Sequence, residues 1–184
     1  MKTFISILRG INVSGHNLIK MDDLRKMYGS LKFRNIETYI QSGNVIFQSE
    51  ADSRELEKKI SGKLLQDFSI QVPVLVMELN ELNKVAQNNP FMNKRKEDIK
   101  TLHVTFLSDP PKKEDLSVIQ KNQYAPDEFM ASGKILYLFC PGGYGNTRLS
   151  NTFFEKKLKV IATTRNWKTV LQLMNIAKRI DDAA

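Results

Sequence analysis

The feature that most constrains the fold is a predicted β-hairpin at residues 38–47, which reads TYIQSGNVIF. Its two arms are rich in β-branched and aromatic residues, which suit a pleated, half-buried surface. Between the arms, Gly43 and Asn44 tolerate the positive φ that a tight hairpin turn requires. The segment therefore predicts two consecutive antiparallel strands.

A second segment repeats this pattern ninety residues later. Residues 129–137 (FMASGKILY) align with residues 39–47 (YIQSGNVIF), so that aromatic residues, the Ser-Gly pair and the apolar arm correspond. Any two hairpins share some of these features, so the match is also consistent with chance. The flanking segments correspond as well, which favours an internal duplication.

The segments around the first hairpin predict the element order β-α-β-β-α-β. Ser53 is the expected N-cap of the second helix, whose apolar residues recur at helical spacing. This order is typical of a ferredoxin-like plait. Apart from the hairpin, the predicted elements are a strand at residues 3–8, a helix at 21–31, a helix from Ser53 to about Phe68 and a strand at 72–77.

The same order starts again after residues 79–100, which predict a connecting helix and a charged linker. We therefore expect an α+β fold, a tandem duplication of ferredoxin-like (βαββαβ) plaits with a C-terminal helix. The expected domains are residues 1–78 and 101–184. The predicted elements of the second half are a strand at 101–107, a helix at 113–121, the second hairpin at 128–140, a helix at 150–158, a strand at 160–163 and a terminal helix capped by Asn166.

Composition excludes several classes of protein. With 41% hydrophobic and 26% charged residues, the 184-residue chain is typical of a globular protein with a buried core. No apolar run approaches the roughly 18 residues of a membrane span, and the start predicts a strand instead of a signal peptide, so we expect a cytoplasmic protein. One cysteine excludes an internal disulfide, and two histidines without cysteine neighbours argue against zinc. We predict no metal and no cofactor.

The net charge of +8 points to anionic partners, whether nucleic acid, phosphorylated metabolites or an acidic protein. Simple solubility is the alternative explanation. The basic runs at residues 94–96, 112–113 and 156–159 lie apart in the sequence, with acidic residues between them. No single basic tail dominates.

Three motifs resemble the bacterial family catalogued as domain of unknown function 1697. They are LRGINV at residues 8–13 together with Asn17, TYIQSGNVIF at 38–47, and ATTRNW at 162–167. The resemblance spans nearly the full chain and implies two ferredoxin-like repeats, but no activity and no catalytic residue. The family usually has a second glycine where Ser14 stands, Ser-Lys in place of Thr147-Arg148, and often asparagine in place of Lys168.

A first candidate site follows from the predicted topology. In this plait strand one lies antiparallel beside strand three, so the end of strand one and the turn between strands two and three share one edge of the sheet. Arginine and amide side chains there suit planar or phosphorylated ligands. Alternatively, Asn, Ser and Gly supply loop conformations and bond to the backbone. The candidate ligand-binding residues are Arg9, Asn12, Asn17, Gln41, Ser42 and Asn44.

A second candidate site is the glycine-rich segment 142–148 (GGYGNTR), with Arg148, Arg165 and Asn166 as candidate ligand-binding residues. It precedes a predicted helix, and helix starts together with glycines favour phosphate binding. The spacing matches neither a P-loop nor a dinucleotide fingerprint, and a plain turn is the alternative. Trp167 is either a stacking surface or the core anchor of the last helix.

Catalytic constellations are scarce. Cys140 lies in an apolar strand without an adjacent base, His16 in a polar loop is a candidate general acid or base, and His103 reads as structural. The catalytic residues stay unknown, and so does whether the chain is an enzyme.

The sequence favours an anionic or nucleotide-like ligand that lies between the plaits and contacts polar loops. A nucleic-acid-binding module is one alternative, although the third strands lack the aromatic RNP1 pattern of RRM domains. A protein-interaction module without ligand chemistry is another. In that case an apolar sheet face with Ile135, Tyr137 and Phe139 would support a homodimer.

Overall fold

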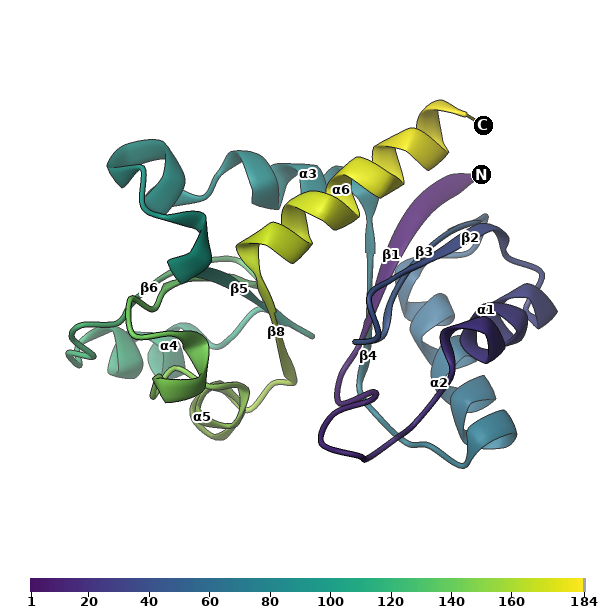
Figure 1. Ribbon diagram of the computed structural model, residues 1–184. Helices are drawn as coiled ribbons and strands as arrows, with labels where there is room; N and C mark the ends of the chain where they lie inside the picture. Colours follow the sequence, from purple (N-terminus) through teal and green to yellow (C-terminus); the bar gives the residue numbers. More distant parts are fainter. Residues whose placement is uncertain (184) are drawn as a thin grey trace. The chain divides into compact units, whose positions relative to one another are not determined.

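The computed structural model describes residues 1–183 and confirms an α+β fold. Within these residues it has two antiparallel four-stranded sheets and six α-helices (Figure 1). The chain divides into two compact units. The first unit comprises Met1–Lys84 together with the chain from Gln172 onward, and the second comprises Val85–Leu171.

The first unit contains a sheet with the strand order β2-β3-β1-β4. Neighbouring strands are antiparallel, and Ile5 of β1 lies opposite Ile46 of β3. This confirms the predicted pairing of the first strand with the third. The elements are β1 (Lys2–Leu8), α1 (Met21–Ser30), β2 (Arg34–Tyr39), β3 (Asn44–Ser49), α2 (Ser53–Phe68) and β4 (Val74–Glu78).

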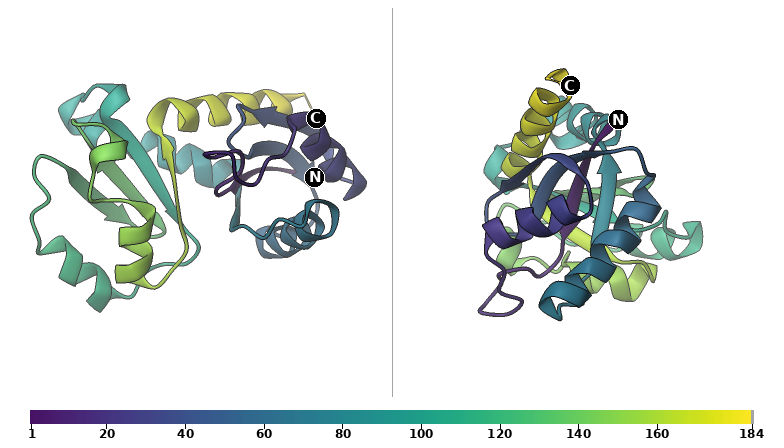
Figure 2. Two further views of the ribbon diagram at one scale, coloured as in Figure 1. Left: turned by 60° about the horizontal axis from the view of Figure 1, so that its bottom comes forward. Right: turned by 90° about the vertical axis from the view of Figure 1, so that its right-hand side faces the viewer.

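Helices α1 and α2 cover one face of this sheet (Figure 2). Alternate strand residues such as Phe4 and Phe47 are fully buried there, because the two-residue period of a strand places them on one face. The N-cap of α2 is Asp52, not Ser53 as predicted, since Asp52 Oδ1 accepts a hydrogen bond of 2.9 Å from Glu55 N. A carboxylate also suits the positive end of the helix dipole.

The last part of helix α6 (Trp167–Asp182) packs on the other face of the first sheet. Thr3 Oγ1 donates to Asp181 Oδ1 at 2.7 Å, and Gln48 Nε2 donates to the Ile180 carbonyl at 3.4 Å. The structure thus groups the chain from Gln172 onward with the first unit, whereas the sequence assigned all of 101–184 to the second.

The second unit repeats the arrangement, with the strand order β6-β7-β5-β8. Helices α4 and α5 contact each other, and residues of both pack into one core cluster with the sheet. The elements are β5 (Leu102–Leu107), α4 (Lys113–Gln120), β6 (Glu128–Ser132), β7 (Ile135–Phe139), α5 (Asn151–Leu158) and β8 (Ala162–Asn166).

Residues 79–100 contain more helix than the predicted linker. After α3 (Leu79–Gln87) come a π-helical turn (Phe91–Arg95) and a 3₁₀ turn (Ile99–Thr101). Two contacts in the second unit explain why this segment is ordered. Tyr137 Oη donates to the Val85 carbonyl at 3.1 Å, and the Phe139 ring stacks on Phe91 at 5.9 Å.

These contacts also involve the apolar sheet face with Tyr137 and Phe139. Tyr137 is buried, whereas Phe139 and Ile135 are partly exposed, and a homodimer through this face stays a prediction. Separately, none of the helices in the described part of the chain is long and apolar enough to cross a bilayer.

Candidate functional site

The hairpin turn of the first unit packs directly against the end of β1. Leu8 N donates to the Gly43 carbonyl at 2.8 Å. Gly43 has a φ of +70°, and a Cβ at this position would lie 2.8 Å from Leu8 Cβ. Only glycine fits this close approach without strain. The predicted meeting of strand end and turn is therefore present.

The amide of Asn12 joins the two predicted loops. Its Nδ2 donates to the backbone carbonyls of Gln41 at 3.0 Å and Ile19 at 2.9 Å, while its Oδ1 accepts from Ile19 N at 2.8 Å. Asn17 Nδ2 donates to the Gly10 carbonyl at 2.9 Å. Both asparagines have φ near +50°, which this residue type tolerates.

The other predicted residues of this loop cluster are similarly engaged. Asn44 is fully buried, and its Nδ2 donates to Ser42 Oγ at 2.8 Å and to the Tyr39 carbonyl at 3.2 Å. Arg9 is partly exposed, and the Gln41 side chain is exposed. The asparagine side chains thus form hydrogen bonds that hold the loop conformation, and ligand binding by this cluster stays a prediction.

In the second unit, the hydroxyl of Thr164 is the centre of a polar network. Thr164 Oγ1 donates to Asn151 Oδ1 at 2.6 Å and accepts from Tyr144 Oη at 3.0 Å. It also lies 2.7 Å from the buried Thr105 Oγ1. The four residues come from β5, β8, α5 and the 3₁₀ turn Tyr144–Asn146. Strand pairing places Thr105 opposite Thr164, which brings the network together.

His103 lies beside this network and was interpreted as structural. Its ring stacks on Tyr144 with a centroid distance of 5.0 Å, and only 9% of the residue is exposed. Burial lowers the pKa of His103, opposed in part by a hydrogen bond with the Thr101 backbone. Within residues 1–183 its Nδ1 makes no hydrogen bond. His103 is therefore a neutral imidazole that packs against Tyr144 of the glycine-rich loop, and its Nδ1 has no hydrogen-bond partner in the described residues.

Arg165 follows Thr164 on the edge strand β8 and is partly buried. Its Nη1 donates to the Thr164 carbonyl at 2.9 Å. Burial lowers the pKa of Arg165 to about 10, opposed by Tyr144, so the guanidinium keeps its charge at neutral pH. In contrast, the hydrogen bonds that Arg95 donates to Glu128 and Glu97 raise the pKa of Arg95. Burial is thus the largest influence on the pKa of Arg165, whereas hydrogen bonds are the largest influence on that of Arg95.

The glycine-rich loop is accessible but uses many of its own amides. An added Cβ at Gly142, Gly143 or Gly145 would meet no atom within 4 Å. However, the backbone N–H groups of residues 143, 146 and 147 bond to carbonyls within the loop. Ser150 Oγ caps α5 by accepting from Phe153 N at 3.2 Å. Three of the loop amides are therefore engaged in the turn itself, and an anion site at this loop stays a prediction.

The remaining predicted residues have distinct places. Asn166 Oδ1 accepts from Thr169 N at 2.8 Å and caps α6, as predicted. Arg148 is exposed. Trp167 is 2% exposed and is a core residue, not a stacking surface. His16 is exposed on its loop.

Burial raises the pKa of the Cys140 thiol to about 11, with an opposing hydrogen bond to Thr147, so the thiolate is scarce at neutral pH.

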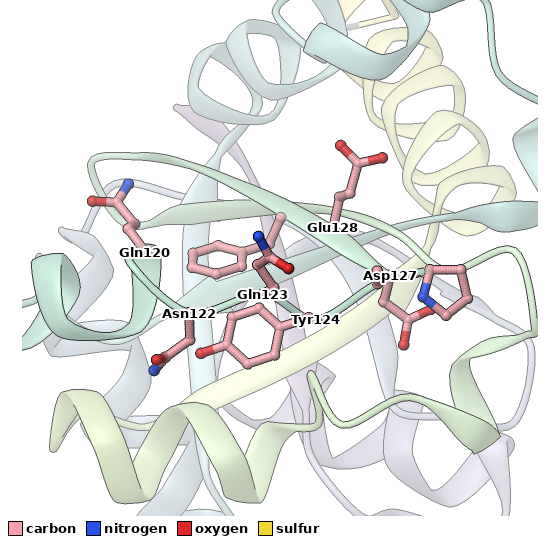
Figure 3. Close-up of a pocket in the computed structure, with 9 residues that line it drawn as sticks. Gln120, Asn122, Gln123, Tyr124, Asp127 and Glu128 are labelled. Atoms are coloured by element: carbon pink, nitrogen blue, oxygen red, sulfur yellow. The ribbon is translucent and has the colours of Figure 1, made fainter.

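Sequence reasoning did not predict a hollow of about 580 Å³ next to β6 (Figure 3). The side chains of Asp127 and Glu128 line the hollow and point in different directions in Figure 3. Both carboxylates accept hydrogen bonds from other segments of the second unit. Glu128 accepts from Arg95 Nη1 at 2.9 and 2.8 Å, and Asp127 Oδ2 accepts from Thr147 Oγ1 at 2.6 Å. Tyr124 and Phe129 pack on each other at 5.9 Å. These engagements give the hollow a structural role.

Comparisons with known proteins match the architecture without assigning a role to these residues. A family model described as protein of unknown function (DUF1697) matches residues 1–137. A solved structure, conserved bacterial protein SP0830 from Streptococcus pneumoniae, is similar with a TM-score of 0.75. The likeness covers 96% of this chain and 98% of that chain at 20% identity, which shows a shared fold. No curated protein matches.

Proposed function

The chain belongs to the DUF1697 family of proteins of unknown function, and we propose that it binds an anionic, nucleotide-like ligand through its polar loops, with Arg165 as the principal anion contact. The observation that carries this proposal is the environment of Arg165. The Arg165 guanidinium is charged at neutral pH and partly buried, and charge interactions are stronger in a partly buried site than on the exposed surface. Its planar fork of donors also matches phosphate geometry.

The polar network beside Arg165 supports the proposed anion contact. Tyr144 of the accessible glycine-rich loop stacks on the buried ring of His103 and donates to Thr164 Oγ1, next to Arg165. The network therefore fixes the position of the loop beside the Arg165 guanidinium. Arg9, Gln41 and Arg148 remain proposed ligand contacts, whereas Asn12 and its neighbouring amides shape the loop.

We also propose that the two units arose by tandem duplication of a ferredoxin-like plait. The repeated order β-α-β-β-α-β and the matching strand orders β2-β3-β1-β4 and β6-β7-β5-β8 support this. Readout of RNA on the sheet face of an RRM-like unit is disfavoured, because Tyr137 is buried and Phe139 stacks on Phe91. The cytoplasmic location stays a prediction.

A thermal-shift panel of pyrophosphate, AMP and ATP tests the proposed function. A ligand at one hundred times its Kd stabilises the folded state by about 2.7 kcal/mol, which raises Tm by several degrees. The expected result is such a rise in the wild type that disappears in Arg165→Gln. Arg34→Gln is the matched control, because Arg34 is an exposed arginine far from Arg165 in the sequence and in the first unit.

An unfolded Arg165→Gln variant would be recognised by its own melting curve without ligand. In that case Arg165→Lys is used, which keeps the positive charge but lacks the planar donor group of the guanidinium. We expect a smaller ligand-dependent increase in Tm for this variant. A rise of equal size in Arg165→Gln, Arg34→Gln and the wild type would contradict the proposed site. No rise with any member of the panel would contradict the proposed ligand class.

A further inference from the structure

The positive charge of the chain is concentrated in the second unit. That unit, Val85–Leu171, has 14 basic and 8 acidic residues, whereas the first unit has 14 basic and 12 acidic residues. Six of the eight net positive charges therefore belong to fewer than half of the residues. Such an asymmetry points to a partner that the second unit attracts.

The topology of the second unit brings separate basic runs to one end of its sheet. Leu107 N donates to the Lys134 carbonyl at 2.9 Å, so the tip of the β6–β7 hairpin meets the end of β5. Ser108 N donates to the Ile161 carbonyl at 2.9 Å, which adds the start of β8. Helix α4 begins shortly after Ser108, and α5 ends shortly before Ile161.

Six lysines lie on these elements, and we call this group the lysine end. All six are exposed, and within residues 1–183 none makes a side-chain hydrogen bond or ion pair. They come from three basic segments that are far apart in the sequence. Its members are Lys112, Lys113, Lys134, Lys156, Lys157 and Lys159.

Four acidic residues share this end, which leaves its formal net charge at +2, because six lysines stand against four acids. Glu155 Oε1 accepts a hydrogen bond of 3.1 Å from Ala162 N. Glu114 and Asp115 lie in the first turn of α4, where they complement the helix dipole. The lysine ammonium groups are exposed and form no ion pair with these acids.

We propose that the lysine end binds the phosphate backbone of a nucleic acid without reading its sequence. Flexible lysines that have no acidic partner suit phosphates, which are recognised as charges along a strand. Protein interfaces, in contrast, are depleted of lysine and depend on aromatic and apolar anchors. Ile161, 41% exposed, stands beside six exposed lysines at this end, and this excess of lysine over apolar residues favours nucleic acid over an acidic protein.

The lysine end is separate from the proposed anion contact at Arg165. Ala162 and Arg165 are three residues apart along β8, or roughly 10 Å. The proposal does not depend on Arg165 binding a ligand. Arg165→Gln is therefore expected to leave nucleic-acid binding unchanged, which keeps the two proposals distinguishable.

Fluorescence anisotropy with a labelled 20-base-pair DNA duplex tests the proposal, between 50 and 200 mM salt. The test variant is the triple substitution Lys156→Gln, Lys157→Gln and Lys159→Gln. Each lysine that contacts phosphate contributes about 0.9 to the slope of log K against log salt. We expect the variant to raise Kd about tenfold or more at 50 mM salt and to lower the slope by up to about 2.7.

The matched control is Lys32→Gln, Lys58→Gln and Lys178→Gln in the first unit. These lysines are also exposed, and each triple contains one residue with positive φ, Lys159 at +58° and Lys32 at +63°. The test and control triples therefore remove the same net charge, and each replaces one residue that has a positive φ. If the test triple is unfolded by circular dichroism, the pair Lys112→Gln and Lys113→Gln replaces it.

The proposal is overturned if the wild type does not bind the duplex at 50 mM salt. Equal loss of affinity in the test and control triples would also overturn it, because the affinity would then depend on the overall net charge and not on the lysine end. Poly-glutamate that binds as tightly as the duplex would assign the lysine end to an acidic protein instead. A selective loss in the test triple, with poly-glutamate binding weakly, would support the proposal.

Discussion

Tyr144 and Thr164 are joined by a hydrogen bond of 3.0 Å from the tyrosine hydroxyl to the threonine Oγ1. The bond ties the glycine-rich turn to the edge strand that carries Arg165. The same tyrosine ring stacks on His103. One side chain thus positions the loop, the imidazole and the strand of the proposed anion contact.

Removing the hydroxyl of Tyr144 tests the contribution of this bond to stability. Tyr144→Phe keeps the ring on His103 and leaves Thr164 Oγ1 without one of its donors. We expect the free energy of unfolding to fall by about 1 kcal/mol, measured by urea denaturation. Tyr39→Phe, at a partly exposed tyrosine of β2, is the control. Equal stability of Tyr144→Phe and the wild type would show that the bond contributes nothing.

Gly43→Ala tests the close approach between the hairpin turn and β1. The added Cβ would lie 2.8 Å from Leu8 Cβ, and φ of +70° is itself unfavourable for alanine. We expect a loss of roughly 3 kcal/mol in the free energy of unfolding. Gly133→Ala shares the positive φ, at +58°, but meets no atom within 4 Å, so its cost is expected to be only about 1 kcal/mol. Equal losses in the free energy of unfolding for Gly43→Ala and Gly133→Ala would contradict the importance of the close contact between residue 43 and Leu8.

Gln48→Ala tests how α6 is held on the first sheet. The side chain is 2% exposed, and its Nε2 donates to Thr3 Oγ1 at 3.2 Å and to the Ile180 carbonyl at 3.4 Å. Truncation leaves buried polar groups unsatisfied, at a cost of about 2 kcal/mol. Gln41→Ala removes an exposed glutamine and should change stability by less than about 0.5 kcal/mol. Similar values for both variants would refute the role of Gln48.

The buried imidazole of His103 predicts a specific pH dependence. Because burial lowers its pKa in the folded state, the unfolded chain binds the proton more readily below pH 6.5. The stabilising contribution of the neutral ring is present above pH 6.5 and is lost as pH falls below it. His103→Phe keeps an aromatic ring on Tyr144 and removes this titration. We expect stability to fall less between pH 7 and 5 in the variant, and parallel curves would contradict the prediction.

The sequence predicted those features that local chemistry determines. The turn at Gly43 and Asn44 specifies the first hairpin, and the order of elements then implies the strand pairing that brings Asn12 to Gln41. The N-cap at Asn166 follows from residue type and position alone. These inferences require no knowledge of distant contacts.

Features that depend on distant partners were not predictable in this way. Thr164 meets Thr105 from 59 residues away and Tyr144 from 20 residues away, so no local pattern signals the network. The lysine end has the same origin, because its three basic segments meet only once the sheet has formed. The packing of α6 on the first unit is equally non-local, since Gln48 and Ile180 are 132 residues apart.

The most direct test of the central claim is an NMR titration with ATP that follows the Nε–Hε signal of Arg165. The signal is assigned by its disappearance in Arg165→Lys. The account predicts that this signal shifts saturably with ATP, while the Nε–Hε signal of Arg34 does not move. ATP binding that shifts signals elsewhere and leaves the Arg165 signal unchanged would contradict it.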